Sequence, residues 1–176
     1  MVVWLRQGVL FLHLLAAVFW IGEILFVSAV LGPLAERLPS RERAELLRTV
    51  GRLTLPWVWT AVSVLVVTGL ANLYLLGIRP QALWHAALYR TAFGWLLAAK
   101  LFVALGMIVH AAVQDFVYGR RTRLLRARLA AAPPAERPAL QAAYARARRR
   151  ARAVGRANLV LALLMLALAA GVMVRT

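Results

Sequence analysis

The sequence has no cysteine, which excludes disulfide bonds, thiolate metal sites and cysteine nucleophiles. Acidic residues are also scarce, with six Asp and Glu against 22 Lys and Arg in 176 residues. Only one of those basic residues, Lys100, is a lysine. The chain also has no glycine-rich phosphate loop, no His-Glu-x-x-His sequence and no Ser-His-Asp arrangement. The familiar sequence signatures of nucleotide-binding, zinc-protease and serine-hydrolase sites are therefore missing.

Hydrophobic residues, by contrast, make up 63% of the chain, and charged residues only 16%. A soluble domain of this length does not bury so much apolar surface, so lipid is expected to be the solvent for much of the chain. The length predicts a single domain, residues 1–176.

Four apolar segments are long enough to cross about 30 Å of hydrocarbon as helices. Backbone groups in lipid must be hydrogen-bonded within their own segment, which favours helices over open strands. The predicted fold is an all-α integral membrane protein, a bundle of four transmembrane helices. The predicted spans are residues 9–31, 53–76, 88–113 and 157–174. A polar loop is expected over 35–52, and a helical hairpin with a proline-containing turn over 116–156.

Arginine distribution predicts the orientation of these spans. Seventeen Arg lie between spans one and two or between spans three and four, and four lie on the opposite side. The positive-inside rule places the Arg-rich segments in the cytoplasm and both termini outside, in a plasma (inner) membrane of bacterial type. Lipid headgroups are the expected partners of these Arg, and no nucleic acid is expected. The length of span one and Glu23 within it favour a retained helix over a cleaved signal peptide.

Ionisable residues inside membrane spans are costly and usually mark function. His13 lies in span one with Ala16 and Ala17 as small neighbours, and Trp20 falls on the same helix face. Small residues beside a membrane-embedded histidine leave room for a flat ligand such as haem. The alternative is a histidine that hydrogen-bonds to a neighbouring helix. In lipid we favour a haem or metal ligand.

A second histidine, His110, follows Met107 on the same face of span three. It is interpreted either as a ligand or as an interfacial side chain. His85 lies in the outer loop and is expected to be an ordinary loop residue. His85 and Met173, at the outer end of span four, are nonetheless the candidates for a second ligand beside His13.

Depth separates His13 from His110. Spans one and three run in the same direction, and the two histidines differ in depth by about 20 Å at 1.5 Å per residue. Two axial ligands of one haem iron lie only about 4 Å apart. The sequence therefore predicts two sites, an outer one with His13 and an inner one with His110.

Glu23 and Lys100 are the deep acid and the deep amine of the bundle. Each has a structural interpretation, as an ion pair or a hydrogen-bonding group, and a catalytic one. Glu23 suits proton transfer. Lys100, together with Arg90, suits pairing with haem propionates or substrate carboxylates. Lys100 is singled out because its ammonium group is a compact point charge, unlike the planar guanidinium of arginine.

A family resemblance covers most of residues 9–115. The stretches His13…Trp20-Ile21-Gly22, Val67-Thr68-Gly69-Leu70 and Gly94-Trp95-Leu96…Lys100-Leu101…His110 resemble the CopD/HemJ group of membrane proteins, which includes copper-resistance D domains and HemJ-type protoporphyrinogen oxidases. The resemblance implies haem b binding, with His13, Lys100 and His110 as functional positions. The chain departs from both patterns, because span four has Asn158-Leu159-Val160 in place of an acid- and proline-containing stretch, and no cluster of Met and His is present.

The sequence thus predicts a membrane redox protein that binds one or two haem b groups and acts in electron transfer or as an oxidoreductase. Quinol, oxygen and porphyrinogen are the candidate substrates, with a quinone or porphyrin as partner. A homodimer is expected, because four short helices enclose little volume. The alternative is a copper transport or resistance protein that uses His13, His110, Met107 and Met173 as ligands. A structural membrane module without cofactor is the third hypothesis.

Overall fold

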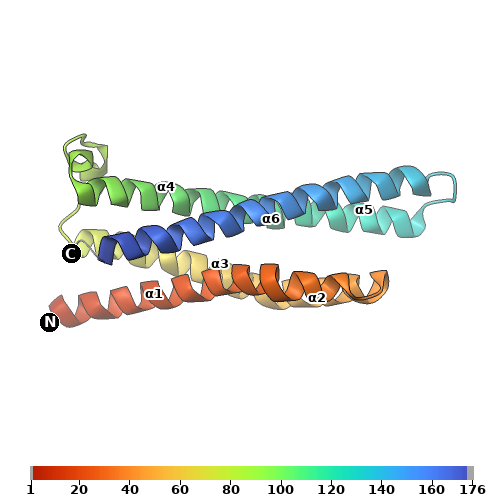
Figure 1. Cartoon of the computed structure of the whole chain (residues 1–176), viewed down its shortest axis with the longest axis horizontal. Coiled ribbons are helices and arrows are strands. Elements are labelled where there is room, and N and C mark those ends of the chain that lie inside the picture. The colour runs from red at the N-terminus through yellow and green to blue at the C-terminus, as the bar shows by residue number, and fades with distance from the viewer. Residues whose placement is uncertain (1, 174–176) are drawn as a thin grey trace. The chain divides into compact units, whose positions relative to one another are not determined.

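The computed structural model describes residues 2–173, and leaves the side chains of residues 2, 80, 84 and 171–173 undescribed. Every regular element within the described range is helical (Figure 1). Four continuous helical stretches, each of 34 to 40 residues, are long and apolar enough to cross a membrane. The chain is therefore a multi-pass membrane protein by length and composition, as predicted.

The first stretch joins α1 (Val2–Phe26), one π-helical turn, η1 (Val27–Leu31), and α2 (Gly32–Glu36). A three-residue connection leads to α3 (Ser40–Leu75), whose N-cap residue is Pro39. The expected polar loop over 35–52 is therefore wrong, since only the residues from 37 to 39 leave the helix. Proline lacks the N–H that a helix interior needs, so the chain turns there and then restarts.

The end of α3 is closed by Gly77. Its φ of 76° lies in the left-handed region that glycine adopts without strain. The Gly77 N–H donates to the Tyr74 carbonyl at 2.9 Å, and the Ile78 N–H donates to the Leu73 carbonyl at 3.0 Å. This pair of hydrogen bonds is the Schellman motif, which satisfies the last carbonyls of a helix. The chain then passes through two short 3₁₀ turns, η2 (Pro80–Trp84) and η3 (Leu88–Arg90).

Thr91 caps the next helix, α4 (Ala92–Ala112). Its hydroxyl accepts a hydrogen bond from the Gly94 N–H at 3.0 Å, a typical side-chain N-cap. Gly94 is required for a second reason. A Cβ at this position would lie 1.9 Å from the Leu88 carbonyl oxygen, so only glycine lets η3 approach α4 this closely.

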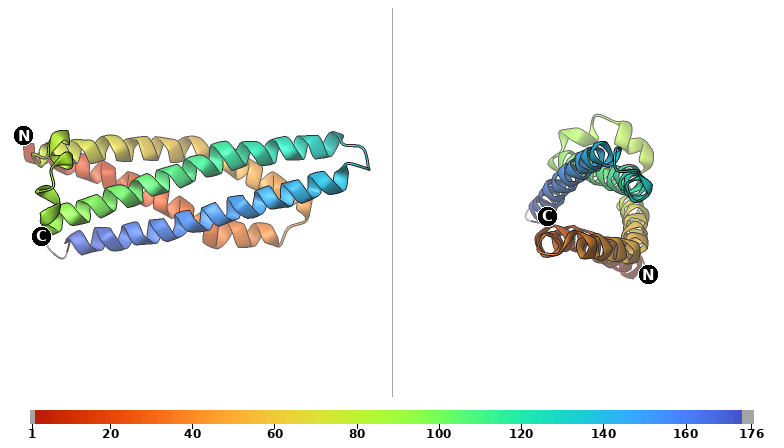
Figure 2. Two further views of the ribbon diagram at one scale, coloured as in Figure 1. Left: turned by 90° about the horizontal axis from the view of Figure 1, so that it is seen from above. Right: turned by 90° about the vertical axis from the view of Figure 1, so that its right-hand side faces the viewer.

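From α4 the helix continues without a break through the π-helical η4 (Val113–Gly119) into α5 (Arg120–Ala131). After a short turn, α6 (Arg137–Met173) returns as one helix of 37 residues. The Arg137 side chain fastens this turn, donating from Nε to the Ala132 carbonyl at 3.0 Å. Figures 1 and 2 show α5 alongside the first half of α6. The structure therefore has a helical hairpin in the stretch where one is predicted, residues 116–156.

Contacts divide the chain into two compact units, residues 1–95 and 96–176, and each is described by itself. In the first unit, α1 packs against α3; we call residues 2–75 the first hairpin. In the second, α6 packs against α5 and η4; we call residues 96–173 the second hairpin. The buried side chains are Ala16, Trp20, Ile21, Ile24, Leu31, Ala35, Val58, Ala61, Val62 and Thr68 in the first hairpin, and Val103, Met107, Ala111, Ala132, Ala147, Asn158 and Ala162 in the second.

Candidate functional sites in the two hairpins

In the first hairpin, His13 on α1 contacts Thr68 on α3. The distance from His13 Nδ1 to Thr68 Oγ1 is 2.9 Å. The Thr68 hydroxyl donates its single proton to the Val64 carbonyl, 2.6 Å away. It can therefore only accept from His13, so Nδ1 carries the imidazole proton. With Nδ1 protonated, a neutral imidazole has its lone pair on Nε2.

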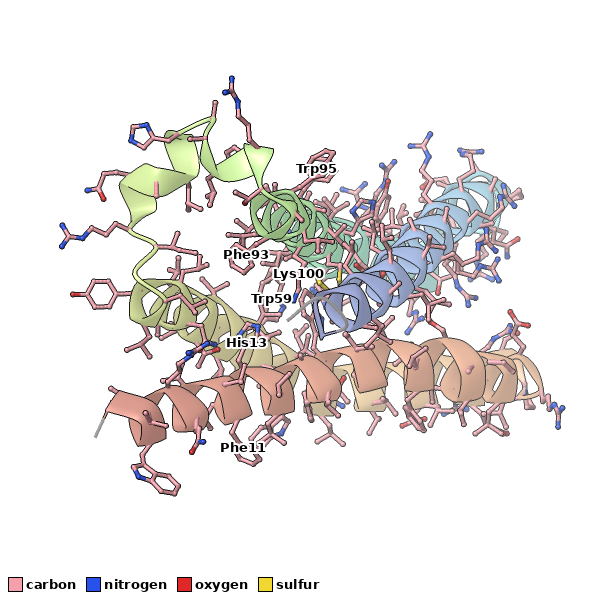
Figure 3. All side chains as sticks on the ribbon, turned by 60° about the vertical axis from the view of Figure 1, so that its left-hand side comes forward. Phe11, His13, Trp59, Phe93, Trp95 and Lys100 are labelled. Atoms are coloured by element: carbon pink, nitrogen blue, oxygen red, sulfur yellow. The ribbon has the colours of Figure 1, made fainter. Side chains whose placement is uncertain are left out.

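Small and buried residues surround this histidine. A Cβ on Gly69 would lie 3.4 Å from His13 Cε1, so the imidazole rests directly against the backbone of α3. Ala16 and Trp20, one and two turns further along α1, are buried on the face that packs against α3. Figure 3 shows His13 pointing toward α3 and Phe11 pointing away from it. The predicted proximity of His13 and Trp20 on one face of α1 agrees with this arrangement.

Glu23 is half-buried on α1. It follows His13 by ten residues, which corresponds to about 15 Å along the helix axis. The deep acid and the histidine of the first hairpin therefore occupy different layers. A role for Glu23 in proton transfer would need a path along α1.

In the second hairpin, His110 is also held by its Nδ1 atom. Nδ1 lies 2.8 Å from the Gly106 carbonyl oxygen, one turn earlier on α4. A carbonyl oxygen can only accept, so His110 donates through Nδ1 and keeps its Nε2 lone pair. Met107, on the same turn as Gly106, has an exposed fraction of 1%. The thioether and the imidazole lie three residues apart, on neighbouring turns of one helix face.

Sequence reasoning overlooked Asn158 as a site residue. Asn158 lies on α6 with an exposed fraction of 6%, and its Oδ1 is buried without a hydrogen-bond partner among the described residues. Buried polar atoms without a partner are rare in folded proteins. The sequence carried a signal, because Asn158 is one of only two asparagines in the chain and lies at the inner edge of the predicted fourth span.

The register of the second hairpin places Asn158 near the level of His110. A Cβ on Gly106 would lie 3.5 Å from Leu161 Cδ1, and a Cβ on Gly155 would lie 3.1 Å from Gln114 Oε1. These two contacts define an antiparallel pairing of the helices. At the midpoint of that pairing, residue 158 faces the turn that contains residues 110 and 111.

The other predicted site residues lie on α4, in the segment between α3 and α4, and at the end of α6. Lys100 is half-buried on α4, about 15 Å along the axis from His110. Arg90 is exposed at the end of η3, and His85 is exposed between η2 and η3. Met173 is the last residue of α6, and its side chain lies outside the described residues. Within the described residues, no three His, Asp or Glu side chains form a group that could hold a metal ion.

Comparison with known proteins gives one partial match. A stretch of 82 residues is 38% identical to an uncharacterized protein of Aquifex aeolicus (strain VF5). It covers 45% of this chain, and the chain spans only 57% of the length of that relative. No protein-family model matches the sequence. No solved structure matches it. The resemblance to the CopD/HemJ group therefore stays a prediction.

Proposed function

We propose that this chain is a membrane redox protein that binds haem b, with His13 and His110 as ligands of separate haem groups. One observation carries the proposal. Both membrane-embedded histidines donate through Nδ1, one to Thr68 and the other to the Gly106 carbonyl. A hydrogen bond at Nδ1 fixes the ring and makes Nε2 the ligand, the usual arrangement of metal-bound histidines.

The surroundings of His13 suit a flat, apolar group, because Gly69 and Ala16 present little side-chain bulk near it. Near His110, Leu161 on α6 packs against Gly106. Haem, when bound, would supply one-electron chemistry whose potential depends on its axial ligands. Thr68 and the Gly106 carbonyl would orient the imidazoles and raise the basicity of their Nε2 atoms.

Helix bounds support two haem sites rather than one shared iron. His13 is the twelfth residue of α1 and His110 the nineteenth of α4. For helices that begin at the same membrane surface, the two differ in depth by about 10 Å. This is half the separation predicted from the apolar spans. It still exceeds the distance of about 4 Å between two axial ligands of one iron.

The proposal includes an orientation and partners. Seventeen of 21 Arg lie on the side of the short α2–α3 connection and of the α5–α6 turn, so this side would face the cytoplasm of a bacterial-type plasma membrane, with both termini outside. The protein would act as a homodimer. Trp20 would line the His13 site. Lys100 and Arg90 would pair with carboxylates of haem or substrate, and Glu23 would transfer protons. Quinol, oxygen and porphyrinogen are the substrate classes.

The absorption spectrum of the full-length protein purified in detergent tests the haem proposal. We expect a Soret band, with α and β bands after reduction by dithionite. His13→Ala and His110→Ala should each remove part of the haem, measured as pyridine haemochrome per mole of protein. Gln81→Ala, on the exposed η2 turn, is the matched control and should keep the full amount. A colourless wild-type protein after expression with added haem precursor would refute the proposal.

Copper handling is the second candidate, and the Met107–His110 pair favours it. A buried thioether and an imidazole on neighbouring turns are ligands that suit copper(I). Metal analysis of the same preparation separates the two functions. Copper retained through dialysis by wild-type protein and lost in Met107→Leu, without a Soret band in either, would support copper handling and contradict the haem proposal.

A further inference from the structure

The second hairpin contains an unusual polar atom, the Oδ1 of Asn158. It is buried and accepts no hydrogen bond from the described residues. His110, the nearest imidazole by register, already donates a hydrogen bond from Nδ1 to the Gly106 carbonyl. A neutral His110 therefore has no second proton to offer Asn158. A buried acceptor without a hydrogen bond destabilises the fold unless a donor from another molecule reaches it.

A second amide lies close to Asn158 across the hairpin. Gln114, half-buried on η4, has its Oε1 against the backbone of Gly155, three residues before Asn158 on α6. A Cβ at position 155 would lie 3.1 Å from this amide oxygen, so the amide would have to shift by a few tenths of an ångström. Gln114 also lies on a π-helical segment, a feature often found at functional sites. We call Gln114 and Asn158 the amide pair.

We propose that the amide pair binds the head group of a quinol. A quinol hydroxyl would donate its proton to Asn158 Oδ1 and so supply the missing hydrogen bond. The ligand must be lipid-soluble, because the pair lies at the inner edge of the predicted apolar spans, where a polar head group with an apolar tail is accommodated. This inference deepens the proposed function, since it names the quinol as the substrate class and places it about one helical turn from His110.

The same chemistry predicts a preference for the reduced form. A quinol carries hydroxyl donors, whereas the quinone carries only carbonyl acceptors. Presented with a quinone, Asn158 Oδ1 would remain unpaired and would face another oxygen. Sites built to hydrogen-bond a ligand proton reject the analogue that lacks it. The quinone form of the same ligand should therefore bind more weakly than the quinol.

Binding of decylubiquinol and decylubiquinone to the full-length protein in detergent tests the inference. Equilibrium dialysis under argon gives both dissociation constants for each variant. We expect wild-type protein to bind the quinol at least about fivefold more tightly than the quinone. Asn158→Leu, of similar size but without donors or acceptors, should bind both forms equally. The matched control Asn72→Leu, on α3, should keep the wild-type ratio. Equal binding of both forms by wild-type protein, or a preference that survives in Asn158→Leu, would overturn the inference.

Selective labelling provides an independent measurement, because the chain has only two asparagines. In protein labelled with ¹⁵N-asparagine, decylubiquinol should shift the side-chain amide signal that is missing from Asn158→Leu and leave the Asn72 signal in place. A shift of neither signal would also overturn the inference. The absorption spectrum of the same sample reports haem separately. Quinol preference without a Soret band would refute the proposed haem function alone, and haem without quinol preference would refute the amide pair alone.

Discussion

The two hairpins pack through different parts of their helices. In the first, α1 packs against α3 through the apolar spans, and 28% of the most apolar window of each helix is buried. In the second, α6 packs against α5 and η4, on the Arg-rich side, and the corresponding values are 17% and 11%. The first hairpin is therefore the more closed in its apolar part. The second leaves more of its apolar surface open, which suits a site that a lipid-soluble ligand must enter.

The largest expected effect on stability comes from Trp20→Ala in the first hairpin. Trp20 has an exposed fraction of 5%, and its removal should lower the free energy of unfolding by about 3 kcal/mol through the cavity left behind. Thermal unfolding in detergent, followed by circular dichroism, gives the measurement. The adjacent Phe19, 45% exposed, is the control, and Phe19→Ala should change stability by much less. Equal losses would show that α1 does not pack through this face.

Thr68→Val tests the polar contact within the closed hairpin. The change keeps the side-chain shape and removes the oxygen that accepts from His13 Nδ1. We expect a loss of about 2 kcal/mol, since the contact is part-buried. The ¹⁵N signals of labelled His13 should also report a change at Nδ1. Thr60→Val is the control, because that exposed hydroxyl donates only to the Pro56 carbonyl. An unaltered His13 spectrum would contradict the assigned proton position.

Tyr144→Phe tests the Arg-rich part of the second hairpin. The Tyr144 hydroxyl accepts a hydrogen bond from Arg126 Nη2 at 2.9 Å, which joins α5 to α6. Arg126 and Arg148 also lie 5.8 and 6.0 Å from the ring centroid. The phenylalanine keeps the ring, so we expect a loss of only about 0.5–1 kcal/mol. Hydrogen exchange should accelerate in α5 and leave α1 unchanged. Faster exchange in both hairpins would contradict a local role.

Ionic strength should produce the smallest effect, and only in one hairpin. Twelve Arg between residues 120 and 156 repel one another, with Glu136 as the acid among them. Raising the salt concentration from about 0.01 M to 0.15 M shortens the Debye length from about 30 Å to about 8 Å. Amide protection in α5 and the first half of α6 should rise slightly, and protection in the apolar part of α1 should stay constant. An equal response in α1 would point to a general detergent effect.

The length of the apolar segments predicted the four membrane helices, because lipid leaves a backbone few alternatives. An Ala- and Arg-rich stretch interrupted by prolines predicted the α5–α6 hairpin. The prediction failed over 35–52, where polar residues were read as a loop. Arg, Glu and Leu are strong helix formers, and Glu45 and Arg48 pair at 3.4 Å on one face of α3. The polar residues over 35–52 indicate where the apolar spans end, whereas the α3 helix continues through most of them.

The candidate sites were predictable only in part. His13 and His110 stand out as ionisable residues within apolar segments. The His13–Thr68 contact depends on the register between α1 and α3, and the sequence pattern of either helix alone does not give that register. Asn158 was overlooked for a similar reason. Its significance comes from the missing partner of Oδ1, and that is known only once the neighbouring helices are placed around it.

The continuity of α4, η4 and α5 has a practical consequence for imaging. One helix of 40 residues, from Ala92 to Ala131, is about 60 Å long, twice the hydrocarbon thickness. Its second half and the first half of α6 form a stiff helical hairpin that ends in Pro133 and Pro134. A small folded domain grafted at that tip, or an antibody fragment raised against it, would move as one body with residues 96–173. It would give electron cryomicroscopy a fiducial for a protein otherwise hidden in its micelle.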